Sequence, residues 1–323
     1  MRLAGTTAGE HLVVDCSLDW AWMLVAEALE PAVPAGVGEP LTVTIDASRE
    51  PLGDLSWAPF ARGVRSKDGA AEIRDACTSG FDLAMRPEGD HARFAFRWRP
   101  PRRSLAARAV LRTRFRLLAR SVLVQYPALW WAAVHGRAPL HAAVVRVGDL
   151  GLLLAGPSGV GKTTVLEDQL SAGWPASTDN LCVSDGRTTW PVVEPMRSAR
   201  ATEGVRAPHG RREISLPHRD HEVEPSAVLI LRRSLDGPPR VRRVQGESGA
   251  RALIAGTYMA GELRRFWPLA ATLAAASGLG PVHPPVAAIA AALTDRLPCF
   301  ELEASRPEDL DLSLALEEIR ACV

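Results

Sequence analysis

The chain has 323 residues, of which 47% are hydrophobic and 23% are charged, and this balance excludes a largely disordered protein. Its formal net charge of +1 excludes a general electrostatic attraction to nucleic acid or to an anionic membrane. Arginine supplies all but two of the 38 basic side chains. A lysine retained in such a chain therefore indicates a role that a planar guanidinium fills poorly.

The first hundred residues have a mixed α and β pattern. Residues 18–29 show helical apolar spacing, residues 41–48 alternate like a strand, and residues 81–98 read as a β-hairpin. The N-terminal residues include Glu10 and lack a continuous apolar core, so no secretory signal is expected.

A long helix is predicted from Ser104 to about residue 125, directly after the helix-breaking stretch PPRR. Its apolar stripe leaves Arg112, Arg116 and Arg120 on the other side of the helix. These arginines fit either a solvated face or a surface that binds an anion or a peptide.

The second half reads as an α/β domain. Residues 140–156 form two predicted strands around a Gly-Asp turn, and the helix that follows ends at Gly173. The alanine-rich stretch 267–293 is broken by glycines and prolines, so two buried helices fit it better than a membrane span. We predict a smaller α+β domain (1–137), with a role in acceptor binding or oligomerisation, and an α/β domain (138–323).

A phosphate-binding loop is predicted at residues 155–164, AGPSGVGKTT, which match the pattern G-x-x-x-x-G-K-[ST] between a strand and a helix. Glycines allow the backbone N–H groups of such a loop to turn toward an anion, and the helix N-terminus adds partial positive charge. Lys162 is expected to reach the outer phosphates from a solvated loop, and Thr163 to bind Mg²⁺. The residues expected to bind the nucleotide are Gly156, Pro157, Ser158, Gly159, Val160, Gly161, Lys162, Thr163 and Thr164.

A carboxylate beyond the helix is the second candidate. The late apolar strand SAVLILRRS ends in arginine rather than in a metal-binding acid, so the metal's second ligand is sought elsewhere. The segment GWPASTDNLCV places Asp179 after a short extended stretch. In a parallel sheet, Asp179 would then lie beside the phosphate loop, and the alternative is a simple Asp-Asn turn.

These segments together resemble the catalytic domain of the HPr kinase/phosphorylase family. The matching features are LHAAVV before a strand, GPSGVGKTT after it, and Asp179-Asn180 beyond the helix. The chain looks still more like the HPr-kinase-like proteins found beside peptide-tailoring genes, including lasso-peptide kinases. The resemblance covers residues 138–190, and the ending 296–305 is similar to the family's last strand.

The resemblance implies roles for individual residues. Lys162 would bind the outer phosphates, Asp179 would match the family's first aspartate, and His141 would lie near the transferred phosphoryl group. The setting of His141 in an apolar strand by itself favours a core residue, and the resemblance makes the catalytic role an equal alternative. The chain departs from the family at Asn180, where the family has a proton-accepting aspartate, because an amide cannot act as a general base. Either Asp179 takes over that task, or the reaction proceeds without a strong base.

Two further features leave alternatives open. The family's metal-binding glutamate would be Glu194 or Glu203, although a surface position is the simpler expectation for both. The arginines of residues 197–212 fit either cations for the phosphates or a solvated loop.

The sequence thus predicts an α/β protein whose P-loop kinase domain has HPr-kinase-like architecture. The expected activity is ATP- and Mg²⁺-dependent phosphoryl transfer to a hydroxyl, on Ser or Thr of a peptide or protein such as a ribosomally made precursor. The alternatives are a small-molecule kinase and a non-catalytic nucleotide sensor. A cytoplasmic location is expected, without nucleic-acid or membrane partners, and a homo-oligomer is compatible with the sequence. The predicted catalytic residues are Lys162, Asp179, His141 and Asn180, and the predicted metal ligands are Thr163 and Asp179.

Overall fold

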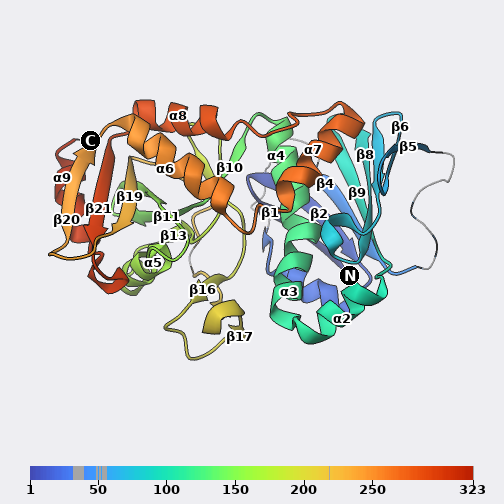
Figure 1. Ribbon diagram of the computed structural model, residues 1–323, viewed down its shortest axis with the longest axis horizontal. Coiled ribbons are helices and arrows are strands. Elements are labelled where there is room, and N and C mark those ends of the chain that lie inside the picture. Colours follow the sequence, from blue (N-terminus) through green and yellow to red (C-terminus); the bar gives the residue numbers. More distant parts are fainter. Residues whose placement is uncertain (32–39, 49, 51, 53–56, 218, 323) are drawn as a thin grey trace. The chain divides into compact units, whose positions relative to one another are not determined.

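The computed structural model describes residues 1–31, 40–48, 50, 52, 57–217 and 219–322 (Figure 1). The chain divides into two compact units, one of Met1–Gly136 with Arg264–Pro284 and one of Arg137–Leu263 with Pro285–Val323. The predicted ranges 1–137 and 138–323 differ from these units chiefly by the segment 264–284.

The first unit contains a nine-stranded mixed sheet in the order β3-β1-β2-β4-β9-β8-β7-β6-β5. The pairs β2–β4 and β4–β9 are parallel, and the other pairs are antiparallel. The predicted strand at 41–48 and the predicted hairpin at 81–98 are confirmed as β4 and β8–β9. The strands of this sheet are β1 (Arg2–Thr7), β2 (Glu10–Cys16), β3 (Glu30–Pro31), β4 (Leu41–Asp46), β5 (Ala58–Ala61), β6 (Val64–Lys67), β7 (Ala70–Ile73), β8 (Phe81–Glu88) and β9 (His91–Trp98).

The helices of this unit correct the prediction of one long helix. The helical chain breaks at Leu111, whose φ of −105° and ψ of 47° are not helical. Arg120 was expected outside the apolar stripe, but it is only 1% exposed, and its Nη1 donates to Glu27 Oε2 at 3.2 Å. The solvated-face expectation therefore fails for Arg120, because the ion pair compensates its burial. The helices are α1 (Asp19–Ala26), the 3-10 turn η1 (Ala76–Thr78), α2 (Arg102–Val110), α3 (Arg112–Arg120), the π-helical turn η2 (Ser121–Gln125), α4 (Tyr126–Val134) and α7 (Phe266–Ser277).

Helix α7 joins the first unit although it comes late in the chain. Its first residue, Phe266, packs against Tyr126 of α4 with ring centroids 5.7 Å apart, and α7 also contacts β7 and β8. Figure 1 shows α7 in orange-red beside the green α4. The prediction of two helices in 267–293 is confirmed, but the two helices belong to different units.

The second unit carries a six-stranded sheet in the order β13-β11-β12-β19-β21-β20, with two small three-stranded sheets, β10-β14-β15 and β16-β18-β17. Its strands are β10 (Ala138–Leu140), β11 (Ala142–Val147), β12 (Leu150–Ala155), β13 (Ala176–Thr178), β14 (Cys182–Ser184), β15 (Thr189–Pro191), β16 (Met196–Ser198), β17 (Val205–Arg206), β18 (Arg212–Ile214), β19 (Ala227–Arg233), β20 (Arg240–Val244) and β21 (Cys299–Ala304). Its helices are α5 (Lys162–Ser171), η3 (Pro208–Gly210), α6 (Gly246–Met259), α8 (Val286–Arg296), η4 (Pro307–Asp309) and α9 (Leu312–Arg320).

The direction of the strands in the six-stranded sheet determines which strand ends lie together at one edge. Strand β11 is antiparallel to both β12 and β13, so β12 and β13 run in the same direction. Strands β19 and β21 continue that direction, since β19 is parallel to β12 and β21 is parallel to β19. The carboxyl ends of β12, β13, β19 and β21 therefore meet at one edge of the sheet, where ligands of such sheets bind.

Helices cover both faces of this sheet. A core of apolar side chains joins one face to α5 and α9, with members such as Leu154, Leu231, Phe300, Leu166 and Ile319. On the other face α6 contacts β11, β12, β19 and β21. In the described residues no helix is both long and apolar enough to cross a membrane.

Candidate functional site

The site begins at the loop between β12 and α5. Three of its glycines have positive φ values, 147° at Gly156, 83° at Gly159 and 124° at Gly161, a region that other residues rarely adopt. A Cβ atom on Gly156 would lie 2.8 Å from the carbonyl oxygen of Leu231, so this position has no room for a side chain. A turn of this kind followed by a helix N-terminus can hold an anion through backbone N–H groups.

Lys162 is the first residue of α5. The sequence predicted that it lies in a solvated loop, but its side chain is buried. Its Nζ donates to the carbonyl oxygens of Gly156 at 2.8 Å and Pro157 at 3.3 Å. Burial lowers the pKa of Lys162 to about 8, against the opposing effect of the carboxylates of Asp179 and Glu262. The ammonium group remains mostly charged at neutral pH and lies folded over its own loop.

Asp179 follows β13 and lies at the same sheet edge as the loop. The sequence expected a parallel neighbour for β13; the neighbour, β11, is antiparallel, but β13 still runs in the direction of β12. The side chain does not cap a local turn, since its Oδ2 accepts from the backbone N–H of Arg197 at 3.4 Å. Burial and the nearby Glu194 raise the pKa of Asp179 to about 6, with Arg197 and Arg219 opposing the rise.

Asn180 and Glu194 form a buried polar pair next to Asp179. The Nδ2 of Asn180 donates to Glu194 Oε1 at 2.8 Å. Glu194 is only 5% exposed, so the expected surface position is wrong for this residue, whereas Glu203 is exposed. An aspartate at position 180 would place a third carboxylate beside Asp179 and Glu194, and the asparagine instead supplies a donor.

Arg197 and Glu262 complete this network, and neither was singled out by the sequence. Arg197 Nη2 lies 2.8 Å from Glu262 Oε1 and 3.8 Å from Glu194 Oε1. Burial alone would lower the pKa of Arg197, but Glu194, Glu262 and Asp179 outweigh it and raise that pKa. The only local signal is the i,i+3 spacing of Glu194 and Arg197, because Glu262 comes from the distant turn between α6 and α7.

His141 lies between β10 and β11 and is 4% exposed. Its Nδ1 lies 3.2 Å from the carbonyl oxygen of Gly256 in α6, and its backbone N–H donates to Thr257 Oγ1 at 3.0 Å. Burial and the positive charge of Lys162 lower the pKa of His141 to about 4, despite Glu262, Gly256 and Asn180 favouring the charged form. The imidazole is therefore neutral at pH 7.

One cavity of about 210 Å³ brings these residues together. Its lining includes all four predicted catalytic residues, His141, Lys162, Asp179 and Asn180, and also both predicted metal ligands, since Thr163 lines it too. Of the predicted nucleotide-binding residues, Gly156, Pro157 and Val160 line instead an adjoining pocket of about 750 Å³. The two cavities share Ser158 and Gly159.

The arginines of residues 197–212 were expected either to supply cations at the site or to lie in a solvated loop, and the segment contains examples of both. Arg211 lines the 210 Å³ cavity, whereas Arg200 pairs with Asp168 on α5 and is exposed. The segment is also more ordered than a loop, since it contributes β17 and parts of β16 and β18 to a small sheet.

No group of three or more His, Cys, Asp or Glu residues that would suit a metal is found within the described residues. Magnesium in phosphate-transfer sites is commonly held by one or two protein ligands together with substrate phosphates and water. Thr163, Asp179 and Glu308 are among the oxygen-bearing residues that line this cavity.

Comparison with protein-family models finds no match, and neither does comparison with curated proteins. Among solved structures, the HPr(Ser) kinase/phosphatase from Coxiella burnetii aligns with 33% of this chain and 76% of its own, at 16% identity and a TM-score of 0.25. A TM-score this low supports no conclusion about a shared fold or activity.

Proposed function

We propose that the protein is a P-loop phosphotransferase that moves the terminal phosphoryl group of Mg²⁺-ATP to a hydroxyl acceptor. The observation that carries the proposal is the single cavity lined by Lys162, Thr163 and Asp179, at the edge where the β12 loop and the end of β13 meet. Phosphoryl transfer depends mainly on positioning and on charge stabilisation, and these three residue types supply both.

The residues of the loop fit a triphosphate. The positive φ angles of Gly156, Gly159 and Gly161 fit a backbone that turns its N–H groups toward an anion. Lys162 would exchange its two carbonyl acceptors for phosphate oxygens, which are stronger partners because they are charged. A whole nucleotide would need the adjoining pocket, because 210 Å³ is below the roughly 300–1,000 Å³ usual for ligand sites.

Thr163 and Asp179 would hold Mg²⁺, which neutralises phosphate charge when bound. Asp179 would also receive the proton of the acceptor hydroxyl as its oxygen bonds to phosphorus and the bond to the ADP oxygen breaks. A pKa of about 6 suits this task near neutral pH, since the carboxylate is ionised and still basic enough to accept a proton. His141 would remain neutral and serve as a hydrogen-bonding group.

A peptide or protein Ser or Thr is the acceptor that we favour, and this part of the proposal rests on the sequence resemblance to HPr-kinase-like proteins of peptide-tailoring clusters. A second candidate, a nucleotide sensor without catalysis, is favoured by one observation. Asn180 uses its amide as a donor to Glu194, so position 180 cannot accept a proton.

Titration of Mg²⁺-ATP into the purified protein tests the proposal. Lys162→Ala should weaken binding about 10- to 100-fold, because a hydrogen bond to a charged group contributes about 1.5–3 kcal/mol. Lys162→Arg should also impair binding, since a planar head does not replace a point charge. The chain's other lysine, Lys67 on β6, gives the matched control, and Lys67→Ala should bind as the wild type does. Wild-type affinity in both Lys162 variants would rule out the loop as the nucleotide site.

A further inference from the structure

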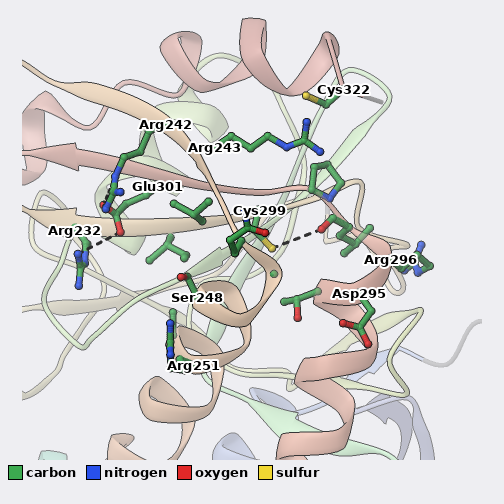
Figure 2. Close-up of a pocket in the computed structure, with 18 of the residues that line it drawn as sticks. Arg232, Arg242, Arg243, Ser248, Arg251, Asp295, Arg296, Cys299, Glu301 and Cys322 are labelled. Carbon is green, nitrogen blue, oxygen red and sulfur yellow. Dashed lines mark hydrogen bonds and ion pairs between the residues drawn. The ribbon is translucent and has the colours of Figure 1, made fainter.

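A third and larger pocket, of about 1,140 Å³, lies in the same unit, and neither Lys162 nor Asp179 lines it. Five of its nineteen lining residues are arginines, a higher proportion than in the chain as a whole, and only two are carboxylates. The arginines come from β19, β20, α6 and α8, and they are Arg232, Arg242, Arg243, Arg251 and Arg296. Figure 2 shows Arg232 and Arg242 on one side of the pocket, Arg251 below it and Arg296 on the opposite side.

Glu301 holds two of these arginines in place. Its side chain is 6% exposed, and its carboxylate lies 2.5 Å from Arg242 Nη2 and 3.3 Å from Arg232 Nη1. The side chain of Arg232 remains 59% exposed and that of Arg242 64% exposed. A guanidinium has five N–H donors, so each keeps donors for a ligand while its position is already fixed.

The other arginines also retain binding capacity. The side chain of Arg243 has no hydrogen bond or ion pair to any described residue, and the side chain of Arg251 pairs only with the exposed Glu247 on its own helix. Exposed pairs of this kind contribute little, so Arg251 can exchange its partner readily. The pocket therefore presents several cations whose present contacts leave donors unused.

The arrangement selects among anionic ligands. The arginines lie on separate sides of the pocket, so a single phosphate would not contact them all (Figure 2). Among the described residues that line the pocket there is no aromatic side chain, whereas single-stranded nucleic acids are usually bound by stacking on aromatic rings. Apolar residues such as Ile230, Ala252 and Leu297 also line the pocket, as suits a peptide that carries apolar residues as well as carboxylates.

We infer that this pocket binds an acidic peptide segment, with its glutamate or aspartate side chains paired to Arg232, Arg242, Arg243 and Arg251. The pocket shares Ile230, Arg232, Ala252 and Ala255 with the cavity that borders the phosphate loop. The two pockets are therefore contiguous, and a peptide bound here would lie next to the proposed nucleotide site. Binding itself requires neither ATP nor transfer, so it is independent of the proposed kinase activity.

Fluorescence anisotropy with a labelled peptide of alternating Glu and Ala provides the test, with the Gln-Ala peptide of equal length as the uncharged probe. The full-length protein should bind the glutamate peptide with an affinity that falls as salt rises. Arg243→Gln combined with Arg251→Gln should weaken binding by about tenfold or more, since two charge-assisted contacts are lost. Arg240→Gln is the matched control, because Arg240 is exposed on the same strand β20 but does not line the pocket.

Lys162→Ala should bind the peptide as the wild type does, which separates this result from that of the phosphate loop. Equal binding of the Glu and Gln peptides would overturn the inference, and so would an equal loss in Arg240→Gln. A single-stranded oligonucleotide of the same charge that binds more tightly through Arg243 and Arg251 would overturn it in favour of nucleic acid. Circular dichroism checks that each variant is folded.

Discussion

Replacing Asn180 by aspartate tests whether the buried polar network is as described. The change removes a donor that lies 2.8 Å from Glu194 Oε1 and puts a carboxylate oxygen in its place. Two unit charges at that separation repel by about 6 kcal/mol at an effective dielectric constant of about 20. Keeping one carboxyl protonated at pH 7 costs only about 4 kcal/mol, that is, about 1.4 kcal/mol for each of roughly three pH units above an ordinary carboxyl pKa. Proton uptake is therefore the cheaper outcome.

The sign of the pH dependence follows from that proton. The folded Asn180→Asp variant keeps a proton that the unfolded chain releases, so its stability should fall as pH rises. Relative to wild type, we expect a loss of about 1 kcal/mol at pH 5 and about 4 kcal/mol at pH 7. Urea unfolding followed by circular dichroism, with the variant and the wild type compared at both pH values, measures this difference.

The double variant Asn180→Asp with Glu194→Gln is the control, because it restores one donor and one acceptor with their places exchanged. It should lose the pH-dependent part of the penalty. An equal penalty for Asn180→Asp at pH 5 and pH 7, or no penalty at either, would refute the assignment of Glu194 as the buried partner of position 180.

Three further predictions follow from the same geometry. The imidazole of His141 should titrate near pH 4 by NMR, so that stability falls as pH drops from about 6.5 toward 4 and the slope is absent in His141→Gln; titration near pH 6.5 would contradict its burial beside Lys162. Below pH 6, kcat/KM for phosphoryl transfer should fall about tenfold per pH unit as Asp179 takes up a proton, and a flat profile would remove it as the base. A fragment of residues 138–323 should be insoluble, because it separates α7 from its unit. The same fragment with residues 264–284 replaced by a flexible linker should be soluble and bind Mg²⁺-ATP. A soluble 138–323 fragment would contradict the division into units.

The glycine-rich loop between β12 and α5 was predictable because its geometry is local. Strand, glycine turn and helix occupy consecutive residues, and the pattern around Lys162 depends on no distant partner. The place of Asp179 needed one more step, the direction of β13 in the sheet. The sequence analysis assumed a parallel neighbour for β13, whereas its neighbour β11 is antiparallel. Asp179 still lies at the expected edge of the sheet, because an antiparallel strand between β12 and β13 leaves these two strands running in the same direction.

The rest of the site depends on contacts between distant segments. Arg197 meets Glu262 across 65 residues, and in a chain so rich in arginine its i,i+3 spacing from Glu194 is too common to separate it from solvated arginines. Glu194 likewise follows an apolar run without any mark of its buried partner Asn180. The apolar pattern of 267–293 predicts helices but cannot indicate which sheet they cover, since hydrophobic periodicity carries no information about the partner surface.

Transfer of label from γ-labelled ATP to a mixture of serine- and threonine-containing peptides tests the central claim most directly. The wild type should form a phosphate ester, Asp179→Asn should reduce the rate by about 10²–10⁴, the usual contribution of a general base, and Asn180→Ala should lose less. Transfer at the wild-type rate by Asp179→Asn, or no transfer by a wild-type protein that binds Mg²⁺-ATP, would contradict the assignment of this cavity as a phosphotransferase active site.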